Sequence, residues 1–61
     1  MTKKEALEVL NNQIDSTMGM GAILFFKNGE KYVGFDLDNE SIVIHAAEVA
    51  LQPNKALEGI I

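Results

Sequence analysis

The dipeptide Asn28-Gly29, which lies between two apolar segments, constrains the fold of this chain more than any other feature. Asparagine and glycine tolerate the two positive φ angles of a type I′ turn, and this pair is the strongest short-range signal for a β-hairpin. The flanking segments, residues 22–27 and 30–38, are therefore predicted to be two antiparallel strands.

A two-residue loop also fixes the register of the predicted hairpin, with Lys27 opposite Glu30 and Leu24 opposite Val33. Alternation of side chains then gives the hairpin two faces. One is a predicted core face that consists of Ala22, Leu24, Phe26, Val33, Phe35 and Leu37, with Lys31 near the turn. The other face is half apolar and half charged, and consists of Ile23, Phe25, Lys27, Glu30, Tyr32, Gly34 and Asp36.

A helix is predicted before the hairpin, over residues 2–18. Thr2 followed by Glu5 is a capping-box pattern, which marks a helix start, and Gly19 is a typical helix stop. Between them, apolar residues recur at the three- and four-residue steps that place side chains on one side of a helix: Leu7, Leu10, Ile14 and Met18.

A second helix is predicted over residues 41–52. Its polar residues, spaced by four, three and four positions, form a narrow stripe on an otherwise apolar helix: Ser41, His45, Glu48 and Gln52. Asp38 or Asn39 supplies the N-cap, and Pro53 ends the helix. The remaining residues, 54–61, form either a further helical turn or a strand.

These elements predict one small α+β domain over residues 1–61: helix, β-hairpin, helix and a short C-terminal helix or strand. A two-stranded sheet is only marginally stable, because both strands are open edges. Either the C-terminal tail or a second copy of the chain is expected to complete the sheet. The second copy is favoured, because the second helix has more apolar circumference than one hairpin covers.

Charge and composition exclude several classes of function. Nine acidic residues against five lysines, with no arginine, give a net charge of −4, so no nucleic-acid partner is expected. The chain has no cysteine, and the acidic residues from Asp36 to Glu40 do not fit a calcium loop, so no metal or cofactor is expected. No apolar stretch approaches the roughly 20 residues that span a membrane. No signal peptide follows the first lysines, so a cytoplasmic location is expected.

No catalytic residues are predicted. Ser41, His45 and Glu48 share one side of the second helix, but side chains that point outward side by side form neither a cleft nor an oxyanion hole. Glycines 19 and 21 precede a strand rather than follow one, which does not match a dinucleotide-binding loop.

The most informative feature for function is the second face of the predicted hairpin, because an aromatic centre with a charged rim is typical of protein interfaces. The predicted interface residues are Ile23, Phe25, Tyr32, Gly34, Asp36 and His45. We therefore expect a noncatalytic interaction module, a homodimer that acts as an inhibitor or adaptor on another protein. A phage or mobile-element product that acts on a host protein would suit this size. The alternative is a small-molecule sensor with a pocket at the dimer seam, lined by Phe25, Tyr32 and His45.

Overall fold

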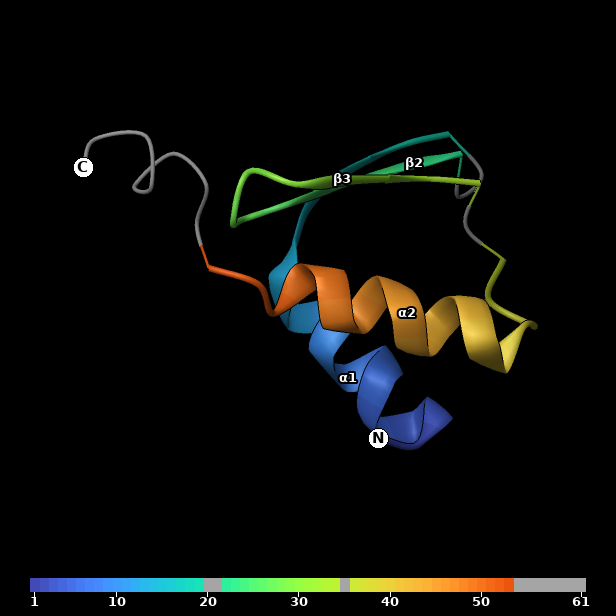
Figure 1. Cartoon of the computed structure of the whole chain (residues 1–61). Coiled ribbons are helices and arrows are strands. Elements are labelled where there is room, and N and C mark those ends of the chain that lie inside the picture. The colour runs from blue at the N-terminus through green and yellow to red at the C-terminus, as the bar shows by residue number, and fades with distance from the viewer. Residues whose placement is uncertain (20–21, 35, 54–61) are drawn as a thin grey trace.

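The computed structural model describes residues 1–19, 22–34 and 36–53. Two helices lie on one face of a three-stranded antiparallel sheet with the strand order β1-β2-β3 (Figure 1). The α+β class and the hairpin are therefore confirmed. In chain order the elements are α1 (Lys3–Gln13), β1 (Ile14–Met18), β2 (Ile23–Phe26), β3 (Lys31–Val33) and α2 (Glu40–Ala50).

Helix α1 begins as predicted. The Thr2 hydroxyl accepts from the backbone N–H of Glu5, and the Glu5 carboxylate accepts from the backbone N–H of Thr2, both at 3.2 Å. These two bonds satisfy donors that have no partner within the helix.

The predicted end of the first helix is wrong, because the helix stops at Gln13 and residues 14–18 form β1. Strand β1 pairs with the free edge of β2, from Ile14 opposite Phe26 to Met18 opposite Ile23. This pairing gives the backbone N–H and C=O groups on that edge of β2 hydrogen-bond partners. If residues 14–18 continued the helix, those groups would face solvent. The sheet thus has three strands within one chain, and Gly19, with φ 55°, belongs to the turn between β1 and β2.

The turn between β2 and β3 is also different from the prediction. Gly29 has φ 90°, but Asn28 does not have a positive φ, which excludes a type I′ turn. The Phe26 carbonyl accepts from the N–H of Gly29 at 3.1 Å, and the Phe26 N–H donates to the carbonyl of Glu30 at 2.9 Å. These bonds close a three-residue loop with the glycine as a bulge residue.

The extra loop residue shifts the register of the hairpin by one position. Leu24 pairs with Tyr32 instead of Val33, so Tyr32 lies on the side of the sheet that faces the helices. Leu24 and Phe26 are buried as predicted, but the other residues predicted for the core face of the hairpin and lying within the described residues are exposed: Ala22, Val33 and Leu37. Phe35 lies outside the described residues.

Helix α2 forms close to its predicted range. Asn39 is its N-cap and accepts from the N–H of Ile42 at 3.2 Å. Val43 is completely buried at the centre of the core, where the other buried residues of the helices are mostly alanines that allow the helix backbones to approach: Ala6, Ala46, Ala47 and Ala50. The two predictions for residues 54–61 lie outside the described residues.

Neither α1 nor α2 combines the length and the hydropathy that a membrane-spanning helix needs, and no other helix is present among the described residues.

Candidate interaction surface

The face of the sheet that points away from the helices is formed by two rows of paired residues. We call it the outer face, and its six residues are Ser16, Met18, Ile23, Phe25, Lys31 and Val33. Strand pairing places Phe25 of the central strand between the two neighbours Ser16 and Lys31, and it places Ile23 between Met18 and Val33. Leu24 and Phe26 alternate with these residues and point into the core, which assigns Ile23 and Phe25 to the opposite side.

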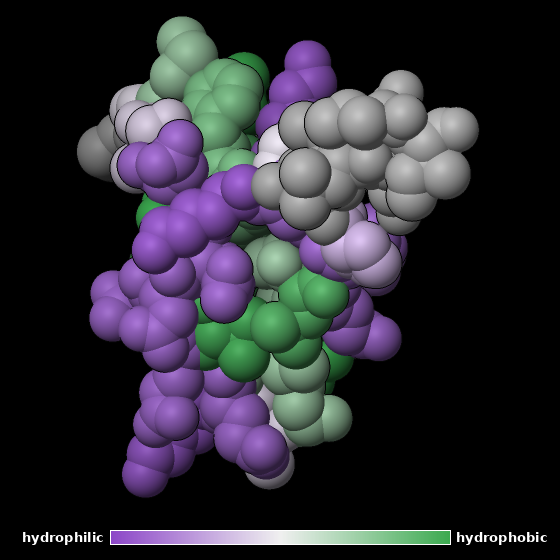
Figure 2. Space-filling model, turned by 90° about the vertical axis from the view of Figure 1, so that its left-hand side faces the viewer, coloured by the Kyte–Doolittle hydropathy of each residue, from purple (hydrophilic) through white to green (hydrophobic). Residues whose placement is uncertain are grey.

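The outer face is apolar and accessible. The side chains of Met18 and Val33 are 58% and 64% exposed, and those of Ile23 and Phe25 are half-buried. Both helices lie on the other side of the sheet (Figure 1). Figure 2, which views the molecule from the end where α2 finishes, shows hydrophobic surface over the sheet at the top. An apolar row that runs across all three strands is unlike the single exposed apolar residues common on protein surfaces.

The charges around this surface are unevenly distributed. Of the six residues of the outer face, only Lys31 is charged, although the chain contains nine acidic residues. Asp15 lies at the opposite edge of the sheet, where the register shifts between Ile14 and Ser16 and leaves it as an extra residue, as in a β-bulge. The two edges of the sheet thus carry charges of opposite sign beside the same row of residues.

Tyr32 and His45 form a pair on the other side of the sheet. The Tyr32 hydroxyl and the His45 Nδ1 are 3.0 Å apart, and the two rings meet edge to face at a centroid distance of 5.5 Å. Tyr32 is half-buried against the core, and His45 is exposed on α2. In the single chain Phe25 lies on the far side of the sheet from both residues, so the three do not line one pocket.

The remaining predicted interface residues lie in the connection from β3 to α2. Gly34 has φ 78° and donates its N–H to the Ala22 carbonyl at 2.9 Å, which extends the hairpin pairing. The Asp36 carboxylate accepts from the N–H of Asp38 at 3.0 Å, in a turn before the N-cap of α2. Both residues are exposed, and both contacts shape the connection between β3 and α2.

Ile23 and Phe25 lie on one face of the sheet, as strand alternation predicts, but Met18 and Val33, which the sequence patterns do not place there, lie beside them. A two-residue loop predicts Val33 in the core, and helical spacing predicts Met18 on a helix stripe. The alternation of Met18 with Ser16 also fits a strand. A three-residue loop ending in glycine is the signal that would have placed Val33 on the outer face.

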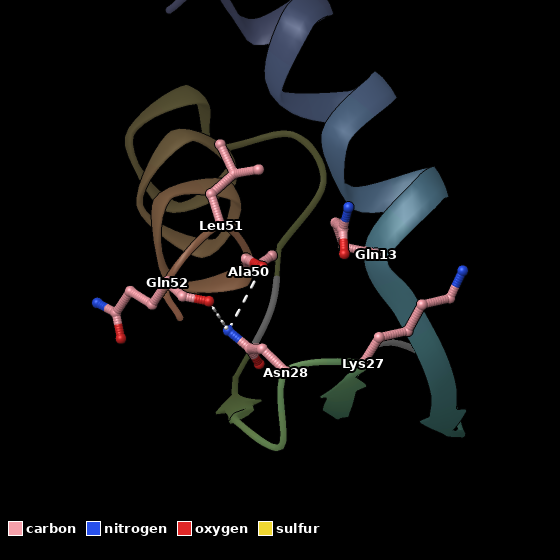
Figure 3. Close-up of a pocket in the computed structure, with 6 residues that line it drawn as sticks. All are labelled: Gln13, Lys27, Asn28, Ala50, Leu51 and Gln52. Carbon is pink, nitrogen blue, oxygen red and sulfur yellow. Dashed lines mark hydrogen bonds between the residues drawn. The ribbon is translucent and has the colours of Figure 1, made fainter. Parts of the chain in front are cut away.

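Asn28 has a structural role beyond the turn that the Asn-Gly pair predicts. Its side-chain Nδ2 donates to the carbonyls of Val49 at 2.9 Å, Gln52 at 3.0 Å and Ala50 at 3.4 Å, and Figure 3 draws the bonds to Gln52 and Ala50. Its Oδ1 accepts from the N–H of Glu30 at 2.9 Å. Asn28 therefore caps the carboxyl end of α2 from the tip of the hairpin and holds the two layers together at that end.

A hollow of about 270 Å³ surrounds this contact (Figure 3). It is slightly smaller than typical ligand pockets, which begin at roughly 300 Å³. The polar atoms of the Asn28 side chain are already engaged in the bonds described above, which leaves them poorly placed to bind a ligand. The lining residues are Gln13, Lys27, Asn28, Ala50, Leu51 and Gln52.

In the part of the chain that the structure describes, no group of three or more His, Asp or Glu side chains is arranged to hold a metal ion. Comparison of the chain with protein-family models, curated proteins and solved structures finds no match.

Proposed function

We propose that this chain is a noncatalytic protein-interaction module whose contact surface is the outer face. The observation that carries the proposal is the apolar row Met18, Ile23 and Val33, which crosses all three strands beside Phe25. The module acts by binding a protein surface through this face rather than by chemistry.

Burial of the outer face against a protein partner offsets much of the free-energy cost of association. Fully burying an exposed Val, Met or Phe side chain contributes about 1.5–3 kcal/mol, and half-buried side chains contribute less. The four apolar residues together therefore supply several kcal/mol, which is comparable with the lower estimates of the cost of association, about 4 kcal/mol. Polar contacts at the rim are needed to turn this into a specific complex.

The arrangement of the polar stripe on α2 supports a noncatalytic role. Ser41, His45 and Glu48 are all exposed on one side of the helix. The hydrogen bond of the His45 Nδ1 goes to the Tyr32 hydroxyl, so that nitrogen is not positioned to activate Ser41.

Site-specific photo-crosslinking tests the proposal. We would replace Phe25 with p-benzoylphenylalanine in cells that produce the protein, and place the same residue at Glu8 on the exposed side of α1 as a matched control. Irradiation is expected to give a discrete adduct from position 25 and none from position 8. The adduct from position 25 is expected to disappear when Val33→Asp is added, because a charge in the apolar row opposes burial.

The mass of the adduct identifies the partner as a second copy, at twice 6.7 kDa, or as another protein. Equal labelling from both positions, or no discrete adduct from position 25, would overturn the proposal.

A further inference from the structure

We propose that the outer face binds a second copy of this chain, face to face, about a twofold axis parallel to the strands. In this dimer Lys31 of each chain lies beside Asp15 of the partner subunit. The inference rests on the proposed function, because it names the partner of the same surface.

The distribution of charge selects this surface for self-association. Two chains of net charge −4 repel each other, and a contact that brings carboxylates of both chains together is unfavourable. The outer face contains no carboxylate, and its single charge, Lys31, lies on the edge strand β3, where a long side chain reaches solvent or a partner at the rim. Contact through this face therefore buries apolar area without burying an acidic group.

The strand order selects the axis. Rotation by half a turn about an axis that runs along β2, midway between the two sheets, places β1 of one chain over β3 of the other. The two Phe25 side chains then meet at the axis. Lys31 lies over Ser16 of the partner subunit, next to Asp15, and the symmetry repeats this pair at the other rim. An axis perpendicular to the strands would instead stack β3, with its lysine, on β3.

The spacing of packed sheets allows this contact. Two sheets pack about 10 Å apart with side chains interdigitated, a gap that apolar residues such as Phe25 and Ile23 fill from both sides. The outer face is small, since its strands contain five, four and three residues. Because stable complexes bury roughly 800 Å² per partner, we expect a reversible dimer with a dissociation constant on the order of 1–100 μM.

Sedimentation equilibrium over a dilution series, with circular dichroism on the same samples, tests the inference. The mass is expected to rise from 6.7 kDa to twice that value with concentration. Phe25→Ser and Val33→Asp are each expected to leave the chain monomeric with an unchanged spectrum. Val33 is the more exposed of the two, so its variant keeps the test valid if Phe25→Ser does not fold.

Charge reversal tests the axis. Lys31→Asp and Asp15→Lys are each expected to weaken the dimer by about 5- to 30-fold, because each change replaces two attractive pairs with two repulsive ones. The double variant is expected to recover to within about threefold of the original, since the pairs are restored with their signs exchanged.

The outcomes separate this inference from the proposed function. A chain that stays monomeric at millimolar concentration overturns the homodimer, while an adduct with a different protein from position 25 would still support the interaction module. A dimer that persists in both Phe25→Ser and Val33→Asp overturns the assigned face. A double charge variant as weak as the single variants overturns the parallel axis.

Discussion

The side-chain amide of Asn28, at the tip of the hairpin, donates a hydrogen bond to the backbone carbonyl of Val49, 2.9 Å away in the last turn of α2. The two residues are 21 positions apart in the chain, and Asn28 is only 7% exposed. One buried side chain therefore joins the sheet to the end of a helix, where the Val49 carbonyl also accepts from the backbone N–H of Gln52 at 3.2 Å.

We expect Asn28→Ala to destabilise the protein by about 2 kcal/mol, because it removes the side-chain donor that three carbonyls at the end of α2 share, one of them on the buried residue Ala50. Asn28→Asp is expected to cost more, since it replaces the donor with a negative charge at the negative end of the helix dipole. Urea denaturation measures both effects, with the exposed Asn12→Ala as a matched control that should change little. Equal stability of the Asn28 and Asn12 variants would show that the cap contributes nothing.

The left-handed backbone at Gly29 predicts a graded response to substitution. A Cβ added at this position would meet no atom within 4 Å, so any cost arises from φ 90° alone. We expect Gly29→Val to lower stability by roughly 1–3 kcal/mol and Gly29→Asn by less, because asparagine tolerates positive φ better than a β-branched residue. Thermal denaturation of the two variants side by side gives the order. If both melt like the parent chain, the three-residue loop is not held in this conformation.

The capping box at the start of α1 predicts a pH-dependent contribution to stability. Hydrogen bonds from the Thr2 backbone and with its side chain hold the pKa of Glu5 below its ordinary value of 4.5. A carboxyl group with a lowered folded-state pKa stabilises the protein above its unfolded pKa, and this contribution is lost as the pH falls through the folded pKa. The gap in urea midpoint between the parent chain and Glu5→Gln should therefore be largest near pH 7 and shrink below pH 4.5.

Glu8→Gln provides the control for that experiment, because Glu8 is an exposed residue further along the same helix. Its gap to the parent chain is expected to be smaller than that of Glu5→Gln at pH 7. A gap for Glu5→Gln that is constant with pH would argue against a stabilising charge in the capping box.

The different burial of two valines predicts that their substitution by alanine lowers stability by different amounts. Val43 is completely buried in the core, whereas Val33 is 64% exposed on the outer face. Val43→Ala is expected to cost about 2 kcal/mol, from the lost transfer of two methyl groups and the cavity that remains. Val33→Ala should cost less than about 0.5 kcal/mol. Denaturation at submicromolar concentration, below the expected dissociation constant of the proposed dimer, compares the chains as monomers.

The starts of both helices could be predicted from the sequence because their signals are local. Thr2 and Glu5, and likewise Asn39, are within three residues of the backbone groups that they cap. The position of the hairpin turn could also be predicted from a local signal, because Gly29 itself provides the positive φ that the turn requires.

The register and the candidate surface were harder to predict. An Asn-Gly pair fits both a two-residue and a three-residue loop, and the choice between them moves Tyr32 and Val33 to opposite faces of the sheet. Asn28 does not adopt a positive φ, and its side chain is engaged with the end of α2. This contact cannot be predicted from the sequence near Asn28, because it depends on where α2 packs against the sheet.

Sequence by itself determined the two helix starts, the position of the hairpin turn and the residues Leu24 and Phe26 that face the core. The tertiary structure alone decided that Ile14 to Met18 form a strand, and that Met18 and Val33 lie on the outer face. Residues 14–18 have apolar spacing that fits a helix, but the unpaired edge of β2 offers their backbone a partner. Local sequence patterns reflect intrinsic preferences, whereas strand pairing depends on backbone groups that come from distant positions in the chain. At residues 14–18 the two conflict, and the strand forms because it gives the edge of β2 its hydrogen-bond partners.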